Sequence, residues 1–210
     1  MKVRTEVIEI TRDMPQWDAV SRAAEVISAG GIVCFPTDTV YGFAASIFSE
    51  RAVMRLRDVK RRGATEPFVV IVDGAGWVSE LACRITKTHR RLMAKHWPGP
   101  LTILFEASPA VPAYVTGGRD TVGLRVPNDT LSQCLLGACG VPLAAPSANP
   151  KGKTPAVSPG EVLESFGGEI DLLLDGGAIE SSDPSTIVAV RSGRVVVLRE
   201  GRTPVTGNAV

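Results

Sequence analysis

The sequence has little histidine, few aromatic residues and no excess of charge of either sign. Two of its 210 residues are histidine, 5% are aromatic, and 23 Lys and Arg residues nearly balance 22 Asp and Glu residues. A net charge of +1 gives no overall field that would attract nucleic acid or an anionic membrane. Any basic surface must therefore be local, and the aromatic side chains that usually stack on single-stranded nucleic acid are scarce.

The four cysteines do not form a recognisable site. They contain no CxxC pair and have no histidine at ligand spacing, which argues against a zinc site and against a disulfide framework. We therefore predict no metal ligands, and we expect reduced, mostly buried thiols at Cys34, Cys83, Cys134 and Cys139.

Motifs of the common enzyme classes are missing too. The sequence contains no GxxxxGK[ST] phosphate loop, no GxGxxG fingerprint, no catalytic triad and no metalloprotease motif. The two histidines, His89 and His96, lie on one basic helical segment, and we expect them at its surface. If a nucleotide binds, cationic side chains must do most of the work.

Composition favours one domain over residues 1–210 without a membrane span. Hydrophobic residues make up 44% of the chain, enough for one sizeable core, and no long linker divides it. No apolar run approaches the length of a membrane span, and the charged segment Met1–Glu6 lacks the apolar run of a signal peptide. We expect a cytoplasmic protein.

Alternation of strand and helix patterns predicts an α/β fold, a twisted mixed β-sheet with helices on its faces. Apolar runs rich in β-branched residues predict strands at Gly31–Phe35, Pro67–Asp73, Leu101–Ala107, Thr121–Val126, Val141–Ala145, Asp171–Leu174, Thr186–Val190 and Arg194–Leu198. Helical spacing predicts helices at Gln16–Ala29, Ser49–Arg62, Lys87–Trp97, Asp129–Gly137 and Ser158–Phe166. Ser192-Gly193 predicts an antiparallel hairpin between the last two strands.

The stretch Gly31–Arg62 places a hydroxyl-rich loop, Pro36–Gly42, and a cationic cluster on either side of apolar structure, which suits a small substrate with a phosphate. A short strand is expected after the loop. Lys60 continues the apolar stripe of the helix that follows, and Gly63 is a natural break after it. We select Lys60 and Arg62 as ligand candidates. Arg51 and Arg55 have the spacing of a solvated face.

Three more groups could meet a ligand at strand ends. Ser147 and Asn149 follow a small-residue strand and could hold phosphate or ribose oxygens, although the segment also fits an ordinary turn. Arg125 and Arg199 lie at the ends of apolar strands and need an acceptor. For Arg125 an internal ion pair and a ligand are equally good explanations, whereas for Arg199 we favour a ligand.

These segments, in this order, resemble the YrdC-like family of threonylcarbamoyl-adenylate synthases over about Ala23–Gly201. Seven motifs carry the resemblance: Pro36–Gly42, Lys60–Arg62, Trp97–Thr102, Gly123–Pro127, Pro146–Asn149, Ser185–Val188 and Leu198–Gly201. The resemblance implies an open basic cavity on the sheet. It also implies a short, single-domain member, since the sequence stops before the extra C-terminal domain of longer members.

The resemblance implies a reaction in which L-threonine, bicarbonate and ATP give threonylcarbamoyl-AMP and pyrophosphate, for threonylcarbamoyl-adenosine in tRNA. Mg²⁺ would come with ATP, and tRNA and a downstream threonylcarbamoyl transferase are further implied partners. Threonine would be held by Thr39, Arg125, Ala145 and Ser185. ATP would be held by Lys60, Arg62, Thr121, Ser147, Asn149 and Arg199, with Lys60 and Arg62 also offsetting charge as pyrophosphate leaves.

The sequence departs from the family pattern at four positions, namely Gly63 for Pro, Glu66 before Pro67, Ile71 for His and Pro155 for Ser. No ligand role is assigned to them. Lys151 and Lys153 lie in a long Pro- and Gly-containing loop that could close as a lid.

Two alternatives remain open. An RNA-binding module would use the basic segments Arg51–Arg62 and Lys87–His96 and would show steep salt dependence without ATP turnover. A paralogue on the same fold would transfer a carbamoyl group to another acceptor.

Overall fold

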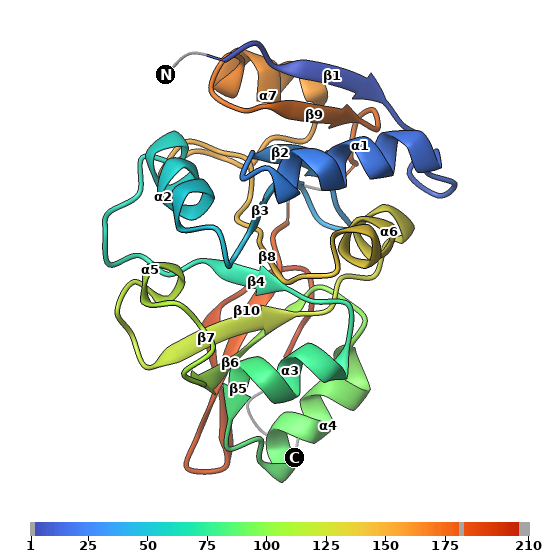
Figure 1. The fold of residues 1–210 in the computed structure, drawn as a ribbon. Coiled ribbons are helices and arrows are strands. Elements are labelled where there is room, and N and C mark those ends of the chain that lie inside the picture. The colour runs from blue at the N-terminus through green and yellow to red at the C-terminus, as the bar shows by residue number, and fades with distance from the viewer. Residues whose placement is uncertain (1–2, 181–182, 206–210) are drawn as a thin grey trace.

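The computed structural model describes residues 3–180 and 183–205, which form a mixed β-sheet with helices on its faces (Figure 1). Its strands are β1 (Glu6–Glu9), β2 (Val33–Pro36), β3 (Tyr41–Ser46), β4 (Val69–Ile71), β5 (Ala82–Cys83), β6 (Leu101–Ala107), β7 (Thr121–Arg125), β8 (Leu143–Ala144), β9 (Leu172–Asp175), β10 (Thr186–Arg191) and β11 (Arg194–Arg199). Its helices are α1 (Trp17–Ser28), α2 (Glu50–Val59), α3 (Ala75–Leu81), α4 (Lys87–His96), α5 (Ala113–Thr116), α6 (Thr130–Cys139) and α7 (Pro159–Phe166).

The sheet order is β1-β9-β2-β3-β8-β4-β7-β6-β10-β11, with β5 paired to β6 off this path. Parallel and antiparallel pairs alternate irregularly, since β4 runs parallel to β7 whereas β6 is antiparallel to β7. The predicted mixed sheet is therefore confirmed. The hairpin of β10 and β11 is confirmed as well, and it turns at Ser192 and Gly193, which both have positive φ.

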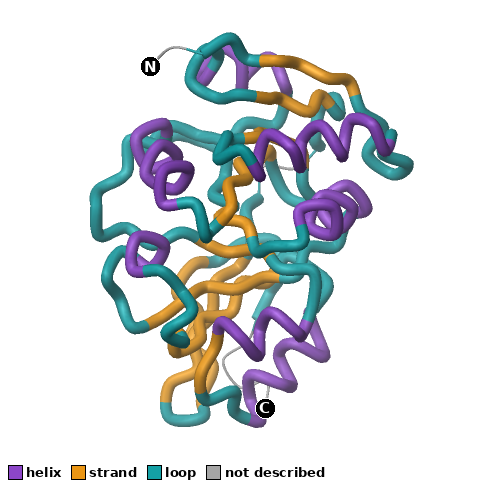
Figure 2. The backbone as a smooth tube through the Cα atoms, in the orientation of Figure 1, coloured by secondary structure: helices purple, strands orange, loops and turns teal. Residues whose placement is uncertain are grey.

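Two apolar clusters lie against the sheet, and the helices cover them (Figure 2). One cluster joins α1 and α6 to β2 and β9, as in the packing of Val20 and Leu135 near Val33. The other includes Phe43 and Phe166, whose rings meet edge to face with centroids 5.0 Å apart. This frame places the loops after β2, β7 and β8 near one another.

Helix α2 ends earlier than predicted. Ser49 caps its start as expected, because its hydroxyl accepts a hydrogen bond from the Ala52 amide at 3.3 Å. The helix stops at Val59, however, and Arg61 adopts a positive φ of 51°. The break thus precedes Gly63, and Arg62 does not stay on the helical face of Arg55.

Two expectations about polar side chains were wrong. His89 is buried rather than at the surface, because its ring completes the capping box of Thr86 at the start of α4 and stacks on Phe105. Arg55 is half-buried in an ion pair with Asp171, at 2.5 Å. The four cysteines are free, but the expectation that they are mostly buried was wrong, because Cys34 alone is buried and the other three are partly exposed.

Four short elements had no predicted counterpart, namely β1, β5, α3 and α5. None of the described helices has the length and apolar character needed to cross a membrane.

Candidate functional site

A cavity of about 70 Å³ opens where loops from distant parts of the chain meet. Seven of the ten predicted site residues line it: Thr39, Arg62, Arg125, Ala145, Ser147, Ser185 and Arg199. Three arginines therefore surround one small space. Such a cluster favours binding of carboxylate or phosphate groups, which match the guanidinium fork.

The loop between β2 and β3 is shaped by its own hydroxyl groups. The Thr37 hydroxyl donates to the carbonyl of Val40 at 2.8 Å and accepts from the amide of Thr39 at 3.1 Å. The Oγ1 atoms of Thr37 and Thr39 lie 3.0 Å apart. A Thr hydroxyl commonly stabilises a turn in this way, and here it holds Thr39 toward the cavity.

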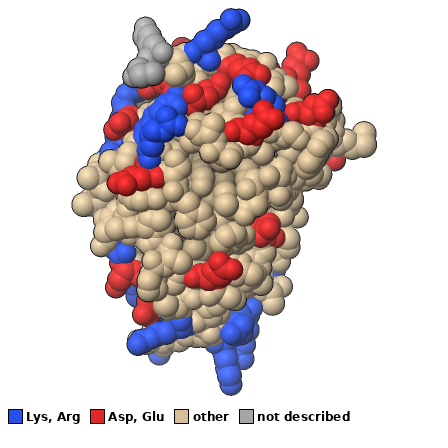
Figure 3. All heavy atoms as spheres, in the orientation of Figure 1, with Lys and Arg blue, Asp and Glu red and all other residues tan. Residues whose placement is uncertain are grey.

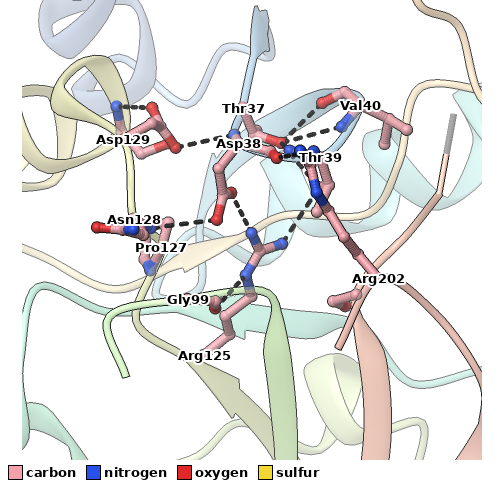
Figure 4. A network of polar contacts seen from close by, with 12 residues as sticks. Thr37, Asp38, Thr39, Val40, Gly99, Arg125, Pro127, Asn128, Asp129 and Arg202 are labelled. Atoms are coloured by element: carbon pink, nitrogen blue, oxygen red, sulfur yellow. Dashed lines mark hydrogen bonds and ion pairs between the residues drawn. The ribbon is translucent and has the colours of Figure 1, made fainter. Parts of the chain in front are cut away.

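Arg125, at the end of β7, is held by three partners from separate segments (Figure 4). Its guanidinium pairs with the Asp38 carboxylate, donates to the Gly99 carbonyl at 3.1 Å and reaches the Thr39 hydroxyl at 3.4 Å. The residue is 7% exposed. The internal ion pair left open by the sequence is therefore present, and Arg125 nevertheless lines the cavity.

Asp38 is itself placed by α6. Its amide donates to the Asp129 carboxylate at 3.1 Å, and its own carboxylate accepts from the Asn128 amide at 3.2 Å. Asp129 is also the N-cap of α6 through the Ser132 amide. Burial raises the pKa of the Asp129 carboxyl, while its hydrogen bonds to Ser132 oppose that rise.

Ser185 and Arg199 meet on the other side of the cavity. The Arg199 guanidinium donates to the Ser185 carbonyl at 2.6 Å and lies 3.1 Å from the Ser185 hydroxyl. The buried hydroxyl of Thr102 lies 2.9 Å from that same hydroxyl and orients it. Partial enclosure of the guanidinium, with the charges of Arg125 and Arg62 nearby, lowers the pKa of Arg199.

Lys60 lies beneath the loop that follows β8. Its ammonium group donates to the carbonyls of Ser147 and Asn149, both at 2.6 Å, and to the Asn149 side-chain oxygen at 2.8 Å. It is 2% exposed. Burial and the charge of Arg62 lower the pKa of Lys60 to about 7. The prediction that Lys60 points inward is confirmed, and its position holds Ser147 at the cavity wall.

Arg62 enters the cavity from the turn after α2. It donates to the Pro67 carbonyl at 2.8 Å, and its guanidinium carbon lies 5.3 Å from the centre of the Phe68 ring. Glu66 faces it at 3.8 Å and also pairs with Lys151 at 2.5 Å. Lys151 and Gly63 lower the pKa of Glu66 by hydrogen bonding to its carboxylate. Glu66 thus points toward Lys151 in the long loop.

Three predicted residues are not part of the lining, namely Lys60, Asn149 and Thr121. The first two lie directly behind Ser147. Thr121 begins β7, at the opposite end of that strand from Arg125. Because Val69 pairs with Gly123 in parallel register, Thr121 lies at the end of the sheet where Pro67 accepts from Arg62.

Sequence reasoning missed several residues that shape the site. Asp38 is not among the residues selected from the sequence, yet it pairs with Arg125, and Thr102 appears there only within the motif Trp97–Thr102. Arg202 donates to the Asp38 carbonyl at 2.8 Å and ties the segment after β11 to the same loop. Nothing in the sequence around Asp38 indicates a partner 87 residues away in the chain.

Comparison with known proteins identifies the family. The sequence model of the protein family Sua5_yciO_yrdC, described as "Telomere recombination", matches residues 25–201. The chain belongs to this family. A threonylcarbamoyl-AMP synthase from Pyrococcus abyssi is 36% identical over 200 residues, which are 95% of this chain and 58% of that protein. One from Cellvibrio japonicus is 32% identical over 84% of this chain and 94% of that protein.

The fold of the family is shared as well. The structure of P. abyssi Sua5 complexed with L-threonine superposes with a TM-score of 0.89 and 36% identity, over 94% of this chain and 58% of that one. The chain thus spans somewhat more than half of the P. abyssi relatives and nearly all of the shorter C. japonicus one.

Proposed function

We propose that the protein is an L-threonylcarbamoyladenylate synthase, a nucleotidyltransferase that converts L-threonine, bicarbonate and ATP to threonylcarbamoyl-AMP and pyrophosphate. One observation carries the proposal: Arg62, Arg125 and Arg199, from three distant segments, line one cavity. The substrates together carry a carboxylate, a bicarbonate and a triphosphate, so they need several cationic partners at once. The names of the synthase relatives support the same reading.

In this proposal the two sides of the cavity hold different parts of the substrates. Arg125 pairs with the threonine carboxylate, and Thr39, Ser185 and the backbone at Ala145 surround the remainder of the amino acid. Ser185 is suited to this role because Thr102 and Arg199 already orient its hydroxyl.

The nucleotide side is formed by Arg62, Arg199 and Ser147, supported from behind by Lys60 and Asn149, with Thr121 nearer the outer end. Arg62 and Arg199 stabilise the charge that develops on the leaving pyrophosphate, and Lys60 adds to the same field when it is protonated. The described residues contain no group of three or more His, Cys, Asp or Glu side chains suited to a metal ion. We propose that Mg²⁺ enters with ATP and is held mainly by phosphates and water.

The chemistry needs no protein nucleophile. The threonine amine attacks bicarbonate to give a carbamate and water, and a carbamate oxygen then attacks the α-phosphorus while the bond to pyrophosphate breaks. Holding the two reactants in line can contribute about 7–11 kcal/mol to lowering the barrier. The adenylate is labile, so we further propose that it passes to a transferase acting on tRNA, which places the activity in the cytoplasm.

The RNA-binding alternative finds no continuous basic surface on the face shown in Figure 3. Helices α2 and α4, which carry the two basic segments, lie at different ends of the molecule (Figure 1). On the face shown in Figure 3, Lys and Arg side chains lie at the upper end and at the lower end, where α4 lies, and the middle of that face carries few charges.

The test is to incubate purified protein with MgATP, bicarbonate and L-threonine and to follow pyrophosphate release. We expect release that requires threonine and is much slower with serine. Release independent of threonine would favour the carbamoyl-transferring paralogue, and no release together with salt-sensitive RNA binding would favour the RNA-binding module.

A further inference from the structure

Arg57 is the least exposed arginine among the described residues, at 4%, although nothing in the sequence singled it out. It lies on the last full turn of α2, three residues before Lys60. Its hydrogen bonds go to backbone oxygens rather than to a carboxylate. A buried guanidinium is costly unless it is fully hydrogen-bonded, so these contacts are needed to keep it inside. Burial also lowers the pKa of Arg57.

The three acceptors of Arg57 belong to two different segments. It donates to the carbonyls of Gly63 at 2.6 Å and Glu66 at 2.8 Å, which are the two ends of the turn after α2. It also donates to the Tyr114 carbonyl in α5 at 2.7 Å. The rigid fork of one guanidinium thus clamps the turn 63–66 against α5, a geometry that a lysine would not reproduce.

Gly117 touches the same turn. A Cβ atom at Gly117 would lie 2.6 Å from both the carbonyl carbon and the oxygen of Thr65, so the backbones touch. Gly117 has a φ of +63° as the C-cap of α5. Gly118, the next residue, has a φ of +78°, and nothing lies within 4 Å of a Cβ placed there.

The clamped turn leads directly into the site. Arg62 precedes it, Pro67 and Phe68 follow it, and Arg62 donates to the Pro67 carbonyl at 2.8 Å. The guanidinium carbons of Arg57 and Arg62 lie 4.9 Å and 5.3 Å from the centre of the same Phe68 ring. A shift of the turn would therefore move Phe68 and Arg62 together.

We propose that Arg57 is a positioning residue for ATP binding. It holds the turn 63–66 in place, with Gly117 packed against that turn, and the turn in its place holds Arg62 at the phosphates of ATP. This inference rests on the proposed function, since it assigns the Arg62 side of the cavity to ATP. It makes ATP affinity depend on a residue that does not line the cavity.

The test compares Arg57→Met with Arg51→Met, an exposed arginine on the same helix that donates to the Ala29 carbonyl. Met keeps a flexible apolar side chain over Phe68 but cannot clamp the turn.

Calorimetry measures ATP affinity, steady-state kinetics measure KM for ATP and for threonine, and amide hydrogen exchange follows residues 60–68. For Arg57→Met we expect ATP binding to weaken by at most about a hundredfold, which is the loss of one charge-assisted contact from Arg62. We also expect little change in the threonine KM and faster amide exchange in the turn. Arg51→Met should behave as wild type.

The glycine pair supplies a second variant if Arg57→Met does not fold. Gly117→Ala and Gly118→Ala carry a similar backbone penalty at positive φ, but only Gly117→Ala pushes on Thr65. Weaker ATP binding in Gly117→Ala than in Gly118→Ala supports the inference. The inference would be overturned if Arg57→Met bound ATP as tightly as Arg51→Met and Gly117→Ala bound it as tightly as Gly118→Ala.

The proposed function fails separately. If wild-type protein binds ATP without threonine-dependent pyrophosphate release, the synthase proposal is wrong, and the ATP affinities of the variants still decide the role of Arg57. Wild-type protein that binds no ATP would overturn both.

Discussion

The ion pair between Asp38 and Arg125 should show strong coupling in a double-mutant cycle of Asp38→Asn, Arg125→Met and the double variant. Both side chains are nearly enclosed, with 12% and 8% of their surfaces exposed. Removing one member of a buried pair leaves the other charge uncompensated, which costs about 3–5 kcal/mol. Removing both leaves no unpaired charge.

The remaining contacts set the magnitudes of the single changes. In Arg125→Met, Asp38 keeps the Asn128 amide and lies beside the cavity, so we expect about 3 kcal/mol of lost stability, the lower end of that range. In Asp38→Asn, Arg125 keeps Gly99 and Thr39, and we expect about 1.5–3 kcal/mol, the value of a charge-assisted hydrogen bond. The double variant should lose little more stability than the less destabilised of the two single variants.

Urea unfolding of the four proteins measures this coupling, which we expect to be about 2 kcal/mol. In a chain of 210 residues, each kcal/mol also shifts Tm by about 2–4 °C. The threonine KM should rise most in Arg125→Met, where the Asp38 carboxylate repels the substrate carboxylate, and less in the double variant, while the ATP KM changes far less. Changes in unfolding free energy that add to within about 0.5 kcal/mol would refute the reasoning. So would an ATP KM that rises more than the threonine KM.

Three further predictions concern the nucleotide side. Arg62→Ala should keep the fold and lose about 1.5–3 kcal/mol of transition-state stabilisation for ATP, seen as a fall in kcat/KM; an unchanged rate would remove Arg62 from the site. The pKa of Lys60 is lowered from 10.5 to about 7, so between these pH values the unfolded chain binds more protons than the folded one. The free energy of unfolding of the wild type should therefore rise with pH across that window, by up to about 1.4 kcal/mol per pH unit relative to Lys60→Met. Parallel stability curves from urea unfolding at several pH values would contradict that pKa. Glu66→Gln should lower the ATP KM at low ionic strength, since it removes a carboxylate 3.8 Å from Arg62. Lys151→Met is the control, and it should change the ATP KM in the opposite direction. Equal ATP KM values for wild type and Glu66→Gln would show that Glu66 turns away when ATP binds.

The longer helices could be predicted from their helical apolar spacing and the longer strands from their apolar runs rich in β-branched residues, because both patterns are local. Ser49, Asp129 and Ser158 each cap a helix as their residue types indicate. The short elements could not be predicted in this way. Strand β1 has four residues and pairs with β9, which is more than 160 positions away, so its strand character comes from its partner.

The end of α2 shows why boundaries near the site were missed. Gly63 is the better local stop signal, yet the helix ends before Arg61. The clamp of Arg57 on Gly63 and Glu66 needs the turn to fold back under the helix, and these tertiary contacts outweigh the local preference of Gly63.

The sequence by itself determined the α/β pattern and the set of cationic and hydroxyl residues that could meet a substrate, because periodicity and residue chemistry are local properties. It also carried the seven motifs of the family, and seven of the ten residues selected from it line one cavity. Only the tertiary structure decided how these residues are held. Asp38 pairs with Arg125, Lys60 supports Ser147 from beneath, and Arg57 clamps the turn beside Arg62. These partners lie far apart in the chain or across a turn, and a contact of this kind exists only once burial forces each charge to find an acceptor.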